Sequence, residues 1–190
     1  MTVKEVVALA AGCLNREDLA AALDKNQNAW TAEEAEELKA LLRCYNFVES
    51  EIALDYCPLK REETVSVVGN KISYSSLSRT PFRIRKVVCG GSLARFSAYP
   101  DYIVVTDGWS GNAKVTYDSI PNAKAVFTSV SDFTGTSVTA QVMACGIAAQ
   151  YCLVNGENNR SALWQRKFRD ALKGANLFRR TVRVRSRRWV

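Results

Sequence analysis

The densest group of side chains able to bind a charged partner lies at the C-terminal end of this 190-residue chain. Six arginines, interleaved with valines, fall within ten residues, and a tryptophan follows them. An arginine guanidinium makes forked hydrogen bonds to phosphate or carboxylate groups, which lysine cannot reproduce. The candidate partner-binding residues are Arg179, Arg180, Arg183, Arg185, Arg187, Arg188 and Trp189.

This C-terminal segment has two functional interpretations. It could grip nucleic acid through the phosphates, or it could dock on an acidic protein surface with Trp189 as an aromatic anchor. The alternation of valine and arginine over residues 182–185 favours a segment that pairs as a strand on another chain. A third interpretation is an unordered, solubilising end, because chain termini are often unordered.

The composition excludes most familiar catalytic chemistry. The chain has no histidine, which rules out Ser-His-Asp and Cys-His catalysis and histidine metal sites. The sequence contains no phosphate-binding loop, no serine three residues before a lysine and no acids at EF-hand spacing. We therefore expect no catalytic residue, no metal, no cofactor and no enzymatic activity. An enzyme would need a pocket built on Lys, Asp, Glu, Ser or Cys alone.

Several features bear on the compartment. The cysteines are scattered and form no CxxC pair, so we expect mostly buried, reduced thiols. Residues 9–13 resemble the end of a lipoprotein signal, but Glu5 and the short apolar stretch argue against export. No apolar run approaches the roughly 20 residues of a membrane-spanning helix, so no membrane association is expected. The cysteines are Cys13, Cys44, Cys57, Cys89, Cys145 and Cys152.

Charge is distributed unevenly along the sequence. Residues 1–63 carry 13 acids and 7 bases, residues 64–170 carry 6 acids and 12 bases, and residues 171–190 carry no acid and 7 bases. The net charge of +7 is therefore concentrated in the last twenty residues. Such a block of like charge is typical of an interaction tail.

Hydrophobic periodicity predicts helices at both ends of the chain. Thr2 with Glu5 and Thr31 with Glu34 have capping-box spacing, and apolar residues follow each pair at helical intervals. The first helix covers about residues 3–14 with Leu9 in its apolar set, a short second one follows Asn15, and the third runs to about residue 56. Near the C-terminus, residues 138–152 show a stripe of small side chains at alternating spacings of four and three, and a last helix covers about residues 159–175.

Between these helices the period changes to two, which predicts five or six short strands. Residues 64–68 and 71–74 flank a Gly-Asn turn and are predicted to form a hairpin. Further strands are predicted at residues 82–88, 93–99, 102–106 and 113–117. The expected fold is α+β, a helical bundle with an inserted small antiparallel β region and an extended Arg-rich C-terminal tail. The expected divisions are residues 1–63 and 138–176 for the bundle, 64–118 for the β region, 119–137 for a loop and 177–190 for the tail.

This organisation resembles bacteriophage head-to-tail connector or adaptor proteins. The likeness lies in acid-rich N-terminal helices, an inserted β region, helices around residues 144–150 and 162–172, and an extended end closing on residues 187–189. The resemblance implies a structural virion subunit in a twelve-fold ring on the portal protein, with neck or tail proteins as further partners and DNA passing through the ring. It also implies synthesis in the host cytoplasm. A nucleic-acid-binding module using the Arg-rich tail is the alternative.

Overall fold

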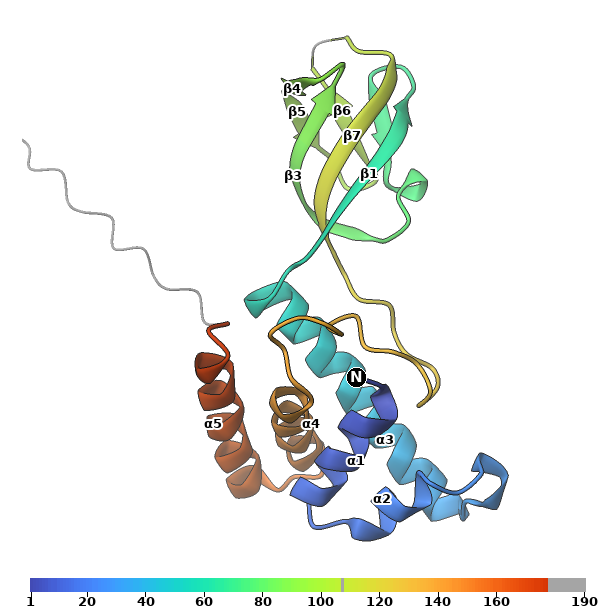
Figure 1. Cartoon of the computed structure of the whole chain (residues 1–190), viewed down its shortest axis with the longest axis vertical. Helices are drawn as coiled ribbons and strands as arrows, with labels where there is room; N and C mark the ends of the chain where they lie inside the picture. The colour runs from blue at the N-terminus through green and yellow to red at the C-terminus, as the bar shows by residue number, and fades with distance from the viewer. Residues whose placement is uncertain (107, 178–190) are drawn as a thin grey trace, which may run out of the picture.

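The computed structural model describes residues 1–106 and 108–177, which form two lobes joined by two passes of the chain (Figure 1). Residues 1–58 and 120–177 make the helical lobe, and residues 59–119 make the β lobe. The predicted mixture of helices with small antiparallel sheets is confirmed. The predicted extended Arg-rich tail lies outside the described residues, except for Leu177, which is buried with the helical lobe.

The helical lobe contains five α-helices in its described residues. The third helix continues into one π-helical turn that ends at Tyr56, just before the chain enters the β lobe. The predicted end of this helix at about residue 56 is therefore confirmed. The helices are α1 (Val3–Cys13), α2 (Glu17–Ala22), α3 (Ala32–Glu51) with η2 (Ile52–Tyr56), α4 (Ala140–Val154) and α5 (Asn158–Gly174), with a 3-10 turn η1 (Gln27–Ala29) between α2 and α3.

Both predicted capping boxes are present. The side-chain oxygen of Thr2 accepts from the Glu5 N–H at 3.3 Å, and the Glu5 carboxylate accepts from the Thr2 N–H at 2.8 Å. Thr31 and Glu34 make the same pair of bonds at 3.1 and 2.8 Å. These bonds satisfy backbone donors that a helix start leaves without partners, which fixes where α1 and α3 begin.

Three helices end in the same way, with a residue in the left-handed region. These residues are Asn15, Gly156 and Asn176, at φ values of 63°, 75° and 56°. After each, backbone N–H groups return to the carbonyls of the last helical turn in the 6→1 and 5→2 pattern of a Schellman motif. The predicted boundary between the first and second helices at Asn15 and the predicted end of the last helix near residue 175 are therefore confirmed.

Helix α4 is the centre of the helical lobe, packed among α1, α3 and α5 (Figure 1). The burial of the predicted stripe is confirmed, since four of its residues lie in α4, Val138 lies just before the helix, and all five side chains are at most 4% exposed. An ideal Cβ added at Gly146 would lie 2.8 Å from Val48 Cγ1 and 3.1 Å from Phe168 Cε2. The absence of a side chain at Gly146 therefore sets how closely α3 and α5 approach α4. The stripe residues are Val138, Val142, Cys145, Ala149 and Cys152.

One position in the first helix departs from the prediction. Leu9, expected with the inward apolar residues of α1, is 44% exposed, whereas Val6 and Ala10 are fully buried. The buried face of α1 is centred on Val3, Val6, Val7, Ala10 and Ala11, because α4 packs along that side.

The described residues of the β lobe form seven strands, which differ in pairing from the sequence prediction. They form one sheet of order β1-β7-β3-β4 and a second of order β2-β6-β5, and every pair within them is antiparallel. The strands are β1 (Leu59–Val67), β2 (Lys71–Ser73), β3 (Pro81–Cys89), β4 (Ser92–Ala94), β5 (Phe96–Ala98), β6 (Tyr102–Val105) and β7 (Gly111–Ser119), with a 3-10 turn η3 (Tyr74–Ser76).

Three predicted features of the β lobe need correction. The β lobe begins at Leu59 rather than residue 64, because the first strand pairs with β7 along its whole length. The predicted hairpin is reduced to the single bridge between Val68 and Lys71, since β1 and β2 belong to different sheets. The predicted strand 93–99 is divided at Arg95, where the chain passes from one sheet to the other. The two sheets enclose a separate apolar core that includes Ile72, Val87 and Ile103.

The first residue of the predicted loop 119–137, Ser119, is the end of β7, and residues 120–137 contain no helix or strand beyond one isolated bridge, between Thr2 and Val130. It nevertheless contributes to the helical core, because Phe127 and Phe133 are 7% and 0% exposed. The loop therefore closes one side of the helical lobe.

The six cysteines are all free thiols, and four of them are buried. Cys13 and Cys57 are the two that are partly exposed. Over the described residues, no helix combines the length and the apolar character needed to cross a membrane.

Candidate functional site

The seven residues predicted to bind a partner all lie outside the described residues, so their geometry remains a prediction. The structure does define the point from which their segment starts. Leu177 is 8% exposed, packs in the helical core, and donates its N–H to the Leu172 carbonyl at 3.0 Å. Asn176 donates to the Lys173 carbonyl, also at 3.0 Å. These two bonds complete the Schellman motif that ends α5.

This starting point lies beside the junction between the two lobes. The C-terminal end of α5 and the π-helical turn η2 lie at the same end of the helical lobe (Figure 1). Their packing is direct, because the rings of Tyr56 in η2 and Phe168 in α5 meet edge to face with centroids 6.4 Å apart. Arg179 follows two residues after Leu177, so the arginine segment originates at this end.

A polar network joins the lobes at the same junction. Arg79, in the β lobe, donates from Nη2 to Asp132 Oδ1 at 3.2 Å, and Lys124 Nζ donates to Asp132 Oδ2 at 2.9 Å. Lys124 Nζ also lies 3.9 Å from Glu49 Oε2 in α3. The β lobe is therefore tied to α3 through a chain of four charged side chains.

Glu49 is the most deeply buried member of this network. Its side chain is 1% exposed, and its Oε1 accepts from the Tyr45 hydroxyl at 3.0 Å, the Ser131 hydroxyl at 2.8 Å and the Asp132 N–H at 3.0 Å. Burial raises the pKa of the Glu49 carboxyl, while the bond from Ser131 and the charge of Lys124 act in the opposite direction. Burial likewise raises the pKa of the Tyr45 hydroxyl. The bonds to Glu49 all lie within the helical lobe, where they hold Asp132 in place, and the ion pair of Asp132 with Arg79 then reaches the β lobe.

A shallow apolar groove runs along the outer side of α1. Ala8, Leu9, Gly12 and Cys13 line it together with Glu5 and Gln141, and its volume is about 700 Å³. Leu9, at 44% exposed, is its largest apolar side chain. Besides the end from which the arginine segment starts, this groove is a surface of the helical lobe that could contact another protein.

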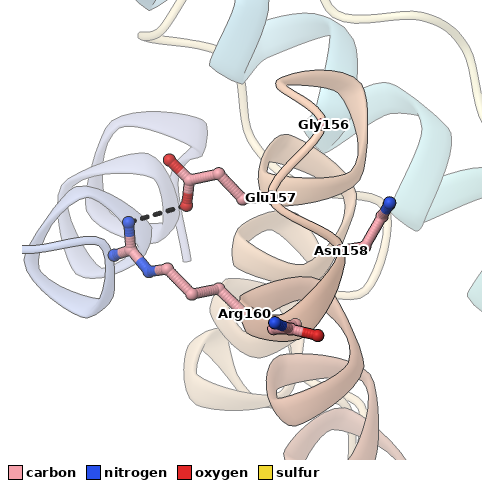
Figure 2. A pocket seen from close by; sticks show the side chains of 5 residues that line it. Gly156, Glu157, Asn158 and Arg160 are labelled. Atoms are coloured by element: carbon pink, nitrogen blue, oxygen red, sulfur yellow. Dashed lines mark hydrogen bonds and ion pairs between the residues drawn. The ribbon is translucent and has the colours of Figure 1, made fainter.

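A smaller pocket of about 350 Å³ lies at the turn between α4 and α5, within residues 156–160 (Figure 2). Figure 2 shows its two charged side chains pointing toward each other, and Arg160 Nη1 donates to Glu157 Oε2 at 2.7 Å. Arg160 Nη2 also donates to the Leu14 carbonyl at the end of α1, at 3.3 Å. The pocket's charges are thus used to hold α5 against α1.

Metal-binding chemistry has no cluster to support it in the part of the chain that the structure describes. No group of three or more Cys, Asp or Glu side chains there could hold an ion. No protein-family model matches the chain, and no curated protein matches it in sequence.

Sequence reasoning missed the junction network and the groove. The four charged residues of the network are separated by up to 83 positions, and nothing in their local sequence indicates that they meet. The groove could not be predicted because Leu9 falls at the helical spacing of the apolar residues and is therefore expected to be buried. Its only sequence signal is that the neighbours Ala8 and Gly12 are small.

Proposed function

We propose that the protein is a structural subunit of a bacteriophage head-to-tail connector, a non-enzymatic adaptor that assembles as a ring on the portal protein. In this proposal the ring is dodecameric, the helical lobe faces the portal, and other neck or tail proteins bind the ring. DNA passes through its centre. The protein is made in the host cytoplasm and becomes part of the virion.

The arrangement of the chain supports a role in assembly. A helical lobe built from both ends of the described chain carries the β lobe as an insertion, which matches the organisation that the sequence resemblance implies. The two lobes have separate apolar cores, so each can present its own surface to a different neighbour. A ring subunit needs at least two such surfaces, because each copy has a neighbour on either side.

The observation that carries the proposal is the fixed origin of the arginine segment. Leu177 is held in the helical core, and six arginines and Trp189 follow it within twelve residues. Thirteen residues, 178–190, span at most about 43–47 Å when extended. That reach is enough for the segment to leave its own helical lobe and cross a neighbouring subunit.

Charge complementarity supports docking on protein. Residues 1–63 carry 13 acids against 7 bases, whereas residues 171–190 carry 7 bases and no acid. Glu33, in the first turn of α3, is exposed and available to a neighbour, whereas the exposed Glu36 already pairs with Lys39 at 2.9 Å. The C-terminal segment is proposed to dock on the portal or on a neighbouring subunit, with its arginines paired to carboxylates and Trp189 filling a pocket.

A nucleic-acid-binding module is the second candidate, and the concentration of arginine without any acid after Asp170 favours it. The two candidates differ in salt dependence. If the arginines bind phosphates, the affinity for duplex DNA should fall steeply as salt is added. The logarithm of the association constant should fall against the logarithm of the salt concentration with a slope near −0.9 for each phosphate contacted. A protein complex with buried apolar contacts should persist at about 0.5 M salt, where the Debye length is only about 4 Å.

Negative-stain imaging of the purified chain, alone and mixed with a portal protein, tests the proposal. We expect rings with the portal, and we expect none when residues 178–190 are deleted. The circular dichroism spectrum of that truncated chain should be unchanged, because the deletion leaves Leu177 in place. Trp189→Ala should weaken the portal complex and leave duplex DNA binding almost unaltered. If Trp189→Ala weakened portal binding and DNA binding equally, the second candidate would be favoured. It would also be favoured if the portal complex and the DNA complex dissociated at the same salt concentration.

A further inference from the structure

The outer face of the second sheet in the β lobe is exposed and carries aromatic and basic side chains. The register pairs Lys71 with Val104 and Ser73 with Tyr102 across β2 and β6, and pairs Ser97 with Val104 across β5 and β6. The intervening residues Ile72, Ile103 and Val105 point into the core and are at most 1% exposed. Because side chains alternate along a strand, the first set lies together on the side facing solvent.

Two tyrosines form a platform on this face. The rings of Tyr99 and Tyr102 stack with centroids 5.0 Å apart and an interplanar angle of 18°. Tyr99 is 47% exposed, so one ring of the pair is open to a further stacking partner. Lys71 Nζ lies 4.9 Å from the centre of the Tyr102 ring, which places a cation beside the platform.

A second cation flanks the platform on the β5 side. The Thr106 N–H donates to the Arg95 carbonyl at 3.0 Å, which extends the ladder by one pair beyond Phe96 and Val105. Alternation then places Arg95 on the same face as Ser97 and Tyr99, about 13 Å along the strand from Tyr99. On the paired strands of this face, the charged side chains among the described residues are Lys71 and Arg95, and both are positive. The nearest acid is Asp101, in the turn that joins Tyr99 to Tyr102.

We propose that this face, defined by Lys71, Arg95, Ser97, Tyr99 and Tyr102, binds single-stranded nucleic acid. A base stacks on Tyr99, and Lys71 and Arg95 contact the flanking phosphates. Every base has a π-face, so this mode tolerates any sequence. A duplex keeps its base faces covered by stacking on neighbours, which is why the single strand is the form that fits an exposed ring. The charge of the face favours a polyanion over a proline-rich peptide, which would need aromatic side chains but no cations.

The test measures binding of a fluorescein-labelled oligo-dT of about 16 nucleotides to the full chain by anisotropy, at about 0.05 M salt. Tyr99→Ala should weaken binding roughly tenfold, the scale of one lost base stack. Ser97→Glu should also weaken it, because the new carboxylate lies between the two cations. Ser66→Glu is the matched control, since this exposed residue lies on β1 in the other sheet and the variant has the same net charge.

This pair of serine variants separates the sheet face from the arginine segment, whose contribution is the same in both. Oligo-dT affinity that is equal in Ser97→Glu and Ser66→Glu, and unchanged in Tyr99→Ala, would overturn the proposal. So would Tyr99→Ala losing affinity for a proline-rich peptide while keeping its affinity for oligo-dT. The test does not depend on ring assembly, so its outcome is independent of the connector proposal.

Discussion

Replacing Gly146 with alanine should destabilise the helical lobe, although the same change favours most helices. An alanine gains up to about 1 kcal/mol over glycine in helix propensity. At Gly146, however, the new methyl group would lie 2.8 Å from Val48 Cγ1, closer than such carbon atoms approach in proteins, and 3.1 Å from the Phe168 ring. Val48 and Phe168 are 1% and 0% exposed, so neither side chain can move outward freely.

The cost of that clash can be isolated with a second glycine. Gly12, in the last turn of α1, has no heavy atom within 4 Å of an added Cβ, so Gly12→Ala should be neutral or slightly stabilising. Overpacking a core typically costs about 1–3 kcal/mol. Since the propensity gain enters both variants, Gly146→Ala should be less stable than Gly12→Ala by about that amount.

Thermal unfolding followed by circular dichroism at a helical wavelength provides the measurement. For a chain of this length each kcal/mol shifts the melting temperature by about 2–4 °C, so Gly146→Ala should melt roughly 2–12 °C below Gly12→Ala. Equal melting temperatures would refute the close packing of α3, α4 and α5 described above. A Gly146→Ala protein that melts above Gly12→Ala would refute it as well.

Two further predictions concern buried titratable groups. In Glu49→Gln the amide oxygen can still accept the bonds to the Glu49 carboxylate, and the buried charge is removed. Because the folded-state pKa of Glu49 is raised, the unfolded chain loses this proton first as pH rises, and the wild-type protein loses stability above about pH 4. In urea unfolding, the free energy of unfolding of Glu49→Gln should therefore rise relative to that of the wild type between about pH 4 and 7. The exposed Glu33→Gln is the control. A difference in stability between Glu49→Gln and the wild type that does not change with pH would contradict a raised pKa for Glu49. Among the thiols, Cys13 and Cys57 are partly exposed and should react with a thiol reagent first, whereas Cys44, Cys145 and Cys152 are buried and should react slowly. Burial raises the pKa of all five thiols, that of Cys44 to about 11, so access of the reagent makes the difference. Fast labelling of Cys145 and Cys152 in the folded protein would place the α4 stripe at the surface.

The sequence predicts the helices well because their signals are local. Thr2, Thr31, Asn15 and the residues around Gly156 each act within one helical turn, through caps that the structure reproduces. The small-residue stripe of α4 likewise reports its burial directly, since a helix lined with small side chains can accept three neighbours.

The β lobe could be predicted only as a set of strands. Leu59 pairs with Ser119, sixty residues away, and alternation of apolar residues carries no information about such partners. The division of the fourth and fifth strands at Arg95 follows from closing two sheets around one core, which is also a non-local requirement. For the same reason the junction network of Arg79, Asp132, Lys124 and Glu49 has no local signature. The arginine segment is the opposite case: composition alone makes it a candidate.

The direct pairing of Leu59 with Ser119 means that the β lobe leaves the helical lobe where it entered. Opposed residues in an antiparallel pair have Cα atoms only about 5 Å apart, so a two-residue turn could close the helical lobe if the strands between them were cut out. Asp132 would keep Lys124 as its partner after losing Arg79. The β lobe is thus an insertion that can be exchanged for another domain without changing the packing of the helical lobe.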